Sequence, residues 1–178
     1  MLKWLWLSAG VIALDQASKL AALAWLAPHQ PHPVLPCLNF TLMFNEGAAF
    51  SFLSGAGGWQ RWLFTALALL VAALIIGWLR DLKPQQKINA AALALILGGA
   101  LGNVIDRLRL GHVVDFIDAW YPAGGRCLPL FTPVRAGDHL GCHWPAFNLA
   151  DSAITLGAAL LIGHALWEAF HTRPGDCR

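Results

Sequence analysis

Four stretches of this sequence are each apolar over a length that can cross a lipid bilayer. A helix needs about 20 residues to span the hydrocarbon core, and the stretches cover 4–27, 62–79, 88–108 and 150–170. A segment surrounded by lipid must satisfy its own backbone hydrogen bonds, which a helix does. The strict alternation of polar and apolar residues that marks a membrane β-barrel is absent. We therefore predict an all-α integral membrane protein with four transmembrane helices, forming a single domain over 1–178.

The low charge of the chain supports the same conclusion. Only 12% of the residues are charged and 57% are hydrophobic, whereas a soluble domain has about 25% charged residues. The formal net charge is +2, and no basic stripe is present that could follow a phosphate backbone. Nucleic acid is therefore not an expected partner.

Lysine and arginine are concentrated on one side of the predicted membrane topology. The segment 28–60 contains neither residue, and the three arginines of 109–149 are dispersed. By the positive-inside rule, both termini and the connection between the second and third spans should be cytoplasmic, and the connections 28–58 and 109–149 should lie outside. The residues that set this orientation are Lys3, then Arg80, Lys83 and Lys87, then Arg173 and Arg178.

The first outside connection is predicted to contain a β-strand. Its four prolines within 28–36 exclude a continuing helix. The stretch LNFTLMFN at 38–45 alternates and is rich in aromatic and branched residues, which favours a strand. The glycine-rich and apolar segment 47–58 is expected to lie on the bilayer surface or against the protein.

Ionisable side chains interrupt the first apolar window. Asp15 and Lys19 lie four residues apart and share a helical face, which permits an ion pair. Such groups cost on the order of 2.5–3.5 kcal/mol each on insertion scales, so they are candidates for supporting a functional site. A purely structural pair is an equal alternative. A cleaved signal peptide would keep its apolar run free of charge, so we interpret this window as a span.

The third window ends in a polar stripe. Gly99, Asn103 and Arg107 are spaced by four residues and therefore stack on one face. The glycine would admit another helix or a ligand, and the asparagine and arginine would supply hydrogen bonds and a fixed cation. Snorkelling to the headgroups is the alternative for Arg107. Asp106 lies about 100° around the helix and is interpreted as an interfacial charge.

Two further aspartates are expected near the outer membrane interface. Asp115 follows the third window, and Asp151 begins the fourth, where it shares a face with Asn148. Two carboxylates within hydrogen-bond reach hold one proton between them and titrate as a unit. In an aspartic protease the charged carboxylate activates water and the protonated one polarises the scissile carbonyl, without a metal.

Other hydrolytic chemistries have weaker support. Neither HExxH nor GxSxG is present. A cluster in the second outside connection could bind a metal, although its spacing matches no standard template. A disulfide between Cys127 and Cys142 is favoured, because that side of the membrane would be oxidising. Cys37 could compete for it, and Cys177 is expected to be a free thiol. The members of the cluster are Cys127, His139, Cys142 and His143.

Several ordered motifs resemble the lipoprotein signal peptidases of bacteria, also called signal peptidase II. Together with the four apolar windows they cover most of the chain. The motifs are DQASK at 15–19, FNEGAAFSFL at 44–53, GGALGNVIDRL at 98–108, GHVVDFID at 111–118 and PAFNLADSAITLG at 145–157.

The resemblance implies an aspartic endopeptidase of the bacterial inner membrane with its site on the periplasmic side. It would need no cofactor and would cut a prolipoprotein just before its diacylglyceryl-modified cysteine. Membrane lipids and globomycin-type inhibitors are implied partners, and we expect a monomer. The family also carries a small extracytoplasmic sheet, a β-rich platform that rests on the membrane, and the segment 33–55 fits it. The implied catalytic pair is Asp115 and Asp151; the substrate-binding residues are Asn45, Gly99, Asn103, Arg107 and Asn148; and Asp15 and Lys19 support them.

One segment departs from the family pattern. Residues 121–143 look like an insertion between the two catalytic motifs, and they contain two of the cysteines. A tolerated surface insertion is favoured over a lid or a docking surface, because loop length costs little closure entropy.

Two other functions are kept as alternatives. A small transporter would also place Asp15, Lys19, Asn103 and Arg107 inside a bundle. A catalytically inactive relative would only bind lipidated precursors.

Overall fold

Four long helices form the body of the protein. The computed structural model describes residues 1–46, 58–123, 126–136 and 139–171. Each of the four helices is long and apolar enough to cross a membrane, which confirms the four predicted helices and fits a multi-pass membrane protein. They are α1 (Leu5–Trp25, preceded by the short 3₁₀ helix η1, Leu2–Trp4), α2 (Trp59–Asp81), α3 (Lys87–Arg109) and α4 (Leu149–His171).

Helix α3 is the centre of the bundle. In its most apolar window 56% of the residues are buried, against 17–22% in the other three helices. Leu93 and Leu97 of α3 pack with Ile75 and Leu79 of α2 in the largest buried apolar cluster. The outward faces of the helices remain strongly apolar, with residues such as Leu74 65% exposed. This distribution is expected for helices whose outer surface faces lipid.

Glycines allow the other helices to approach α3 closely. A Cβ atom on Gly98 would lie 2.7 Å from Val11 Cβ of α1, and one on Gly102 would lie 2.6 Å from an oxygen of Asp15. A Cβ on Gly99 would clash with the backbone oxygen of Ala150 in α4. These three glycines of α3 are therefore used for packing within the bundle.

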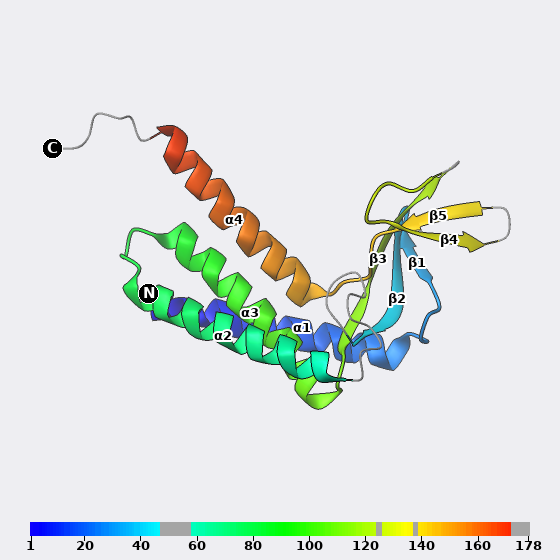
Figure 1. Ribbon diagram of the computed structural model, residues 1–178, viewed down its shortest axis with the longest axis horizontal. Helices are drawn as coiled ribbons and strands as arrows, with labels where there is room; N and C mark the ends of the chain where they lie inside the picture. The colour runs from blue at the N-terminus through cyan, green and yellow to red at the C-terminus, as the bar shows by residue number, and fades with distance from the viewer. Residues whose placement is uncertain (47–57, 124–125, 137–138, 172–178) are drawn as a thin grey trace.

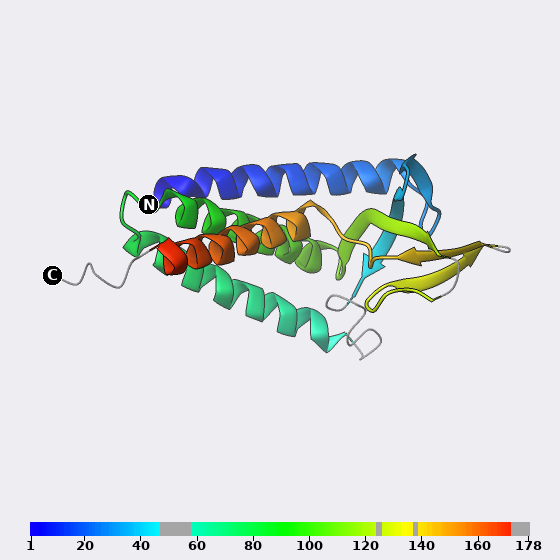
Figure 2. The same ribbon diagram turned by 90° about the horizontal axis from the view of Figure 1, so that it is seen from above.

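A five-stranded antiparallel sheet lies at the end of the bundle where α3 ends and α4 begins (Figures 1 and 2). The N-terminus and the C-terminal end of α4 lie at the opposite end. The strand order is β1-β2-β3-β5-β4. The strands are β1 (His32–Leu35), β2 (Leu38–Asn45), β3 (Val113–Ala123), β4 (Thr132–Ala136) and β5 (His139–His143).

Strand β3 connects the sheet to the helices and to the apparent insertion. Its first half pairs with β2, with Met43 opposite Asp115, and its second half pairs with β5, with Trp120 opposite His143. The strand predicted at 38–45 is present as β2. The glycine-rich part of the first connection, 47–57, and Cys177 lie outside the described residues.

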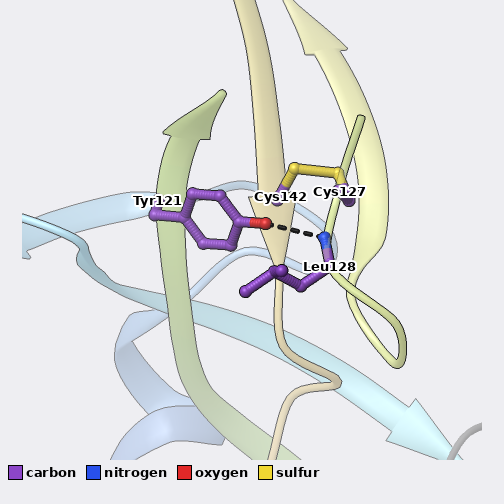
Figure 3. Close-up of a disulfide and its surroundings, with 4 residues drawn as sticks. All are labelled: Tyr121, Cys127, Leu128 and Cys142. Carbon is purple, nitrogen blue, oxygen red and sulfur yellow. Dashed lines mark hydrogen bonds between the residues drawn. A yellow bond between two sulfur atoms is a disulfide. The ribbon is translucent and has the colours of Figure 1, made fainter. Parts of the chain in front are cut away.

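The segment 121–143 is folded onto the end of β3. Cys127 and Cys142 form the predicted disulfide, and the backbone N–H of Leu128 donates to the Tyr121 hydroxyl at 2.8 Å (Figure 3). The ring of Phe131 packs edge-on against Tyr121. Cys37 is exposed and is not part of a disulfide among the described residues. The insertion thus extends the sheet by two strands.

Candidate active site

Asp115 is buried near the start of β3. The residue is only 3% exposed. Asn45, the last residue of β2, donates from Nδ2 to Asp115 Oδ2 at 3.2 Å. The antiparallel register places Val113 opposite Asn45 and so brings this amide beside the carboxyl. Strand pairing therefore positions both side chains.

Asn148 and Asp151 cap the N-terminus of α4. The backbone N–H of Asp151 donates to Asn148 Oδ1 at 2.9 Å, and the backbone N–H of Asn148 donates to Asp151 Oδ2 at 3.3 Å. This reciprocal pair has the geometry of a capping box, with Asn148 at the N-cap and Asp151 at the third helical position. Asn148 and Asp151, three residues apart in the sequence, thus cap the start of α4, and their hydrogen bonds fix both side chains.

The segment before α4 brings this cap to Asp115. The carbonyl oxygen of Phe147 accepts hydrogen bonds from the backbone N–H groups of Phe116 and Ile117 at 3.1 and 2.8 Å. The next side chain, that of Asn148, then reaches β3, and its Nδ2 donates to Asp115 Oδ1 at 2.7 Å. Asn148 consequently contacts both carboxylates, which lie 36 positions apart in the sequence.

Asn103 of α3 contacts Asp151 and connects it to Asn148 and Lys19. Its Nδ2 donates to Asp151 Oδ1 at 2.8 Å, while its Oδ1 accepts from Asn148 Nδ2 at 3.2 Å and from Lys19 Nζ at 2.9 Å. An ammonium group only donates, so Lys19 keeps the oxygen of the Asn103 amide on its own side. The amide nitrogen is thereby directed at Asp151.

Lys19 is held by two buried acidic residues. Its Nζ lies 2.9 Å from Asp15 Oδ2 and 2.8 Å from Asp106 Oδ2, and the three residues are at most 2% exposed. The predicted ion pair between Asp15 and Lys19 is thus present. The interpretation of Asp106 as an interfacial charge is wrong, because Asp106 faces α1 and pairs with Lys19.

The two acidic residues of this cluster also hold backbone at the site. Asp15 Oδ1 accepts from the backbone N–H of Ala150 at 2.9 Å, and Asp106 Oδ2 accepts from that of Val114 at 3.1 Å. The cluster therefore ties α1 and α3 to the residues that immediately precede Asp151 and Asp115. That Asp15 and Lys19 support the carboxylate pair stays a prediction, with which these contacts agree.

Arg107 and Gly99 have different relations to the pair. Arg107 lies close enough to Asp151 and Asp115 for charge–charge interaction, and its guanidinium lies 5.7 Å from the ring centre of Phe64 in α2. Gly99 faces the α4 backbone, as described above, and provides space for α4. A contact between Gly99 and substrate stays a prediction.

The environment of Asp115 favours its protonated form. Burial raises the pKa of Asp115 from an ordinary value of 3.8 to about 7, and the charge of Asp151 acts in the same direction. The hydrogen bonds from Asn45 and Asn148 and the charge of Lys19 act against this rise. A group with this pKa exchanges its proton near neutral pH, as a general acid requires.

Two residues of the site were missed in the sequence. Asp106 was misassigned, and Gln16 was passed over although it lies within the DQASK motif. Gln16 Nε2 donates to Asp106 Oδ1 at 2.9 Å and to the Gly102 carbonyl at 3.2 Å. The available signal was the spacing of four between Gly102 and Asp106, which places the aspartate on the α3 face that the glycine opens to α1.

The cysteine and histidine cluster of the second connection is engaged elsewhere. Cys127 and Cys142 are joined in the disulfide. His143 Nδ1 lies 2.7 Å from Asp118 Oδ1, and Thr41 donates to the other oxygen of Asp118 at 2.9 Å. These contacts join the second half of the sheet to the first. The side chain of His139 lies outside the described part of the chain.

Comparison with known proteins gives a consistent result. The family described as Signal peptidase (SPase) II matches residues 7–167. A protein named lipoprotein signal peptidase from Teredinibacter turnerae is 46% identical over 177 residues, covering 99% of this chain and 95% of that protein. Another of that name from Acinetobacter baumannii is 52% identical over 159 residues, covering 89% and 80%.

Solved structures share the fold. One described as a bacterial membrane enzyme, determined by the in meso method at 2.3 Å resolution, superposes with a TM-score of 0.76 at 26% identity and covers 99% of this chain and 94% of its own. A second, described in the same words at 1.9 Å resolution, gives a TM-score of 0.70 at 28% identity and covers 92% of each chain.

Proposed function

Because this chain belongs to the signal peptidase II family, and is thus a peptidase that removes signal peptides from prolipoproteins, we propose that Asp115 and Asp151 are its catalytic pair. The bond cleaved would be the one just before a diacylglyceryl-modified cysteine. The observation that carries this proposal is that one residue, Asn148, hydrogen-bonds to both carboxylates.

The surroundings of the two carboxyls suggest different roles. Asp151 lies in the first turn of α4, where the helix dipole favours a negative charge, and it accepts hydrogen bonds from Asn103 and from the Asn148 backbone. Asp115 lies in a strand without such a dipole, and burial raises its pKa to about 7. We assign Asp151 as the charged general base and Asp115 as the protonated general acid.

The reaction follows from this assignment. Asp151 removes a proton from a water molecule as its oxygen bonds to the scissile carbonyl carbon, while Asp115 donates its proton to the carbonyl oxygen. The tetrahedral intermediate then collapses: Asp115 takes the proton back, and Asp151 passes its proton to the leaving nitrogen. The products are the carboxyl end of the signal peptide and the free amino group of the lipidated cysteine, and both aspartates return to their starting states.

The remaining polar residues are proposed to hold the substrate backbone. A peptide that unwinds in a site with little water needs partners for its carbonyl groups. Asn45, Asn148 and Asn103 border the carboxylates, and Arg107 adds a cation beside them. The acyl chains of the substrate would stay against the lipid-facing helices, where each buried methylene contributes roughly 0.8 kcal/mol.

The orientation of the chain is part of the proposal. The distribution of lysine and arginine supports a cytoplasmic position for the end of the bundle that carries the N-terminus. The sheet and the two carboxylates would then face the periplasm from the inner membrane. Globomycin-type inhibitors are expected to compete at the carboxylate pair.

A direct test uses the purified chain and a synthetic prolipoprotein. We expect cleavage of the precursor that carries a diacylglyceryl cysteine and little cleavage of the same peptide with an unmodified cysteine, as followed by gel mobility and mass spectrometry. A metal chelator should leave the rate unchanged. Loss of activity with EDTA that is restored by zinc would contradict the carboxylate mechanism.

The pH dependence tests the assignment of Asp115 as the acid. Its pKa is raised to about 7, so its proton is present below that pH and is lost as the pH rises through it. We therefore expect kcat/KM to fall on the alkaline side of about pH 7, although the measured value belongs to the coupled pair. Asp118→Asn serves as the control, because Asp118 is a buried carboxyl of the same strand that does not contact the pair. A profile that is flat from pH 6 to 9, or an alkaline limb lost in Asp118→Asn, would contradict the assignment.

A further inference from the structure

Gln16 of α1 hydrogen-bonds to both buried aspartates of the cluster around Lys19. Its Nε2 donates to Asp106 Oδ1 at 2.9 Å and to Asp15 Oδ2 at 3.2 Å. The same nitrogen donates to the carbonyl oxygen of Gly102 in α3 at 3.2 Å. The side chain therefore joins α1 to α3 at the level of the cluster, and the mechanism proposed above does not use it.

Each of these aspartates holds a backbone N–H group with its other oxygen. Asp106 Oδ2 accepts from Val114 at 3.1 Å, and Asp15 Oδ1 accepts from Ala150 at 2.9 Å. Val114 and Ala150 immediately precede the two carboxyl residues of the proposed catalytic pair. Gln16 thus bridges the two contacts that fix where β3 and α4 carry those carboxyl groups.

Lys19 cannot supply the contact that Gln16 makes to Asp106 Oδ1. An ammonium group has three donors, and those of Lys19 face Asn103 Oδ1 at 2.9 Å, Asp15 Oδ2 at 2.9 Å and Asp106 Oδ2 at 2.8 Å. Among the described residues, Gln16 makes the only hydrogen bond to Asp106 Oδ1. Because Asp106 is only 2% exposed, losing that donor would leave a buried carboxylate oxygen unsatisfied. The carboxylate would then be free to rotate away from the backbone N–H group that it holds.

Arg109 sets the orientation of the Gln16 amide. Its Nη1 donates to Gln16 Oε1 at 3.2 Å. A guanidinium group only donates, so it keeps the amide oxygen on its own side and directs the nitrogen at the two aspartates. Arg109 is the last residue of α3 and is exposed.

We propose that Gln16, oriented by Arg109, is a positioning residue that holds the two carboxyl groups of the catalytic pair at their working separation. This inference rests on the proposed function. In the described part of the chain Gln16 makes no hydrogen bond to Asp115 or Asp151, so it acts through the aspartates that it bridges. Displacing a reacting group by about 1 Å can lower a rate about a hundredfold. Loosening one of the two supports therefore slows the cleavage step itself.

The test is single-turnover cleavage of a lipidated precursor with enzyme in excess, in which the rate constant reports the folded molecules and the amplitude reports their fraction. Gln16→Met keeps the length of the side chain and removes both donors. We expect its rate constant to fall about tenfold, while the enzyme concentration that gives half the maximal rate changes less than twofold, because the surfaces that bind the acyl chains are unchanged.

Ser8→Ala is the matched structural control. Ser8 also joins α1 to α3, since its hydroxyl donates to the carbonyl oxygen of Ala94 at 2.8 Å, and it is 3% exposed. It lies eight residues before Gln16, which is about 12 Å along α1. Its loss should lower the free energy of unfolding and leave the rate constant unchanged.

Arg109→Met keeps the inference testable if Gln16→Met does not fold. It should lower the rate constant about threefold, the effect of one hydrogen bond, and should have no further effect in the Gln16→Met background. Arg80→Met, which removes the same charge from an exposed position at the other end of the bundle, should have no effect.

The outcomes separate the inference from the proposed function. A rate constant within twofold of the wild type in both Gln16→Met and Arg109→Met, or an equal loss in Ser8→Ala, would overturn the inference and leave the proposed function intact. Failure of the wild-type enzyme to cleave the lipidated precursor would contradict the function itself.

Discussion

Replacing Asp151 or Asp115 singly with asparagine is expected to lower the cleavage rate by at least about a thousandfold, because each variant removes one half of the proton exchange. Asparagine has nearly the same size as aspartate and keeps an acceptor oxygen. In Asp151→Asn this oxygen can still accept from the Asn148 backbone and preserve the cap of α4. In Asp115→Asn it can still accept from Asn148 Nδ2. The loss should therefore appear in kcat rather than in folding.

The measurement is single-turnover cleavage of a lipidated precursor, followed by gel, together with an unfolding curve for each variant. Asp118→Asn is the control in the same strand. It loses the negative charge beside His143 and one of the two oxygens that accept hydrogen bonds there, so it is expected to lose stability while its cleavage rate stays within a few-fold of the wild type. If either Asp115→Asn or Asp151→Asn cleaved the precursor at the native rate, the assignment of the catalytic pair would be wrong. A thousandfold loss in Asp118→Asn would move the catalytic carboxyl along β3.

The helices were predictable because lipid imposes a length and a composition on any segment that crosses it. The boundaries were less predictable. Helix α2 begins at Trp59 and ends at Asp81, beyond the apolar window 62–79, because backbone hydrogen bonds continue through the polar residues at each end. Hydropathy does not register those bonds.

That the candidate residues lie close together could be predicted from the sequence, but only part of their contacts could. The spacing of Asn148 and Asp151 carried the information for a capping box. The meeting of Asp115 with that cap depends on Phe147 pairing beside β3, a non-local contact that no local pattern specifies. Asp106 was misassigned for a related reason: its direction is set by the close approach of α1, which Gly102 permits.

The segment 121–143 could be recognised as unusual but could not be built from the sequence. Its prolines and glycines suggest irregular backbone, yet Tyr121 to Ala123 continue β3 and pair with β5. The pairing is stabilised by partners remote in sequence, including the disulfide that joins Cys127 to Cys142. Strand propensity depends strongly on such context.

Lys19→Met is expected to lower the free energy of unfolding by about 3–5 kcal/mol, the cost of leaving buried charges without their partner. The side chains of Asp15 and Asp106 are 0% and 2% exposed and both lie within 2.9 Å of Lys19 Nζ. Methionine fills a similar volume but supplies no charge. The same change removes the donor that fixes the Asn103 oxygen, so kcat should also fall while KM for the lipidated precursor changes little.

Equilibrium unfolding in mixed micelles, with cleavage kinetics on the same preparations, separates the two effects. Lys3→Met removes the same charge from an exposed position and should change neither quantity appreciably. The double variant Lys19→Met/Asp106→Asn should recover part of the stability, because one uncompensated carboxylate is gone. It should not recover kcat, because the Asn103 oxygen still lacks the Lys19 ammonium and keeps only the donor from Asn148. Stability and kcat recovering together would show that Lys19 affects cleavage only through folding. If Lys19→Met were fully active, the buried cluster of Lys19, Asp15 and Asp106 would not be needed to position Asp151.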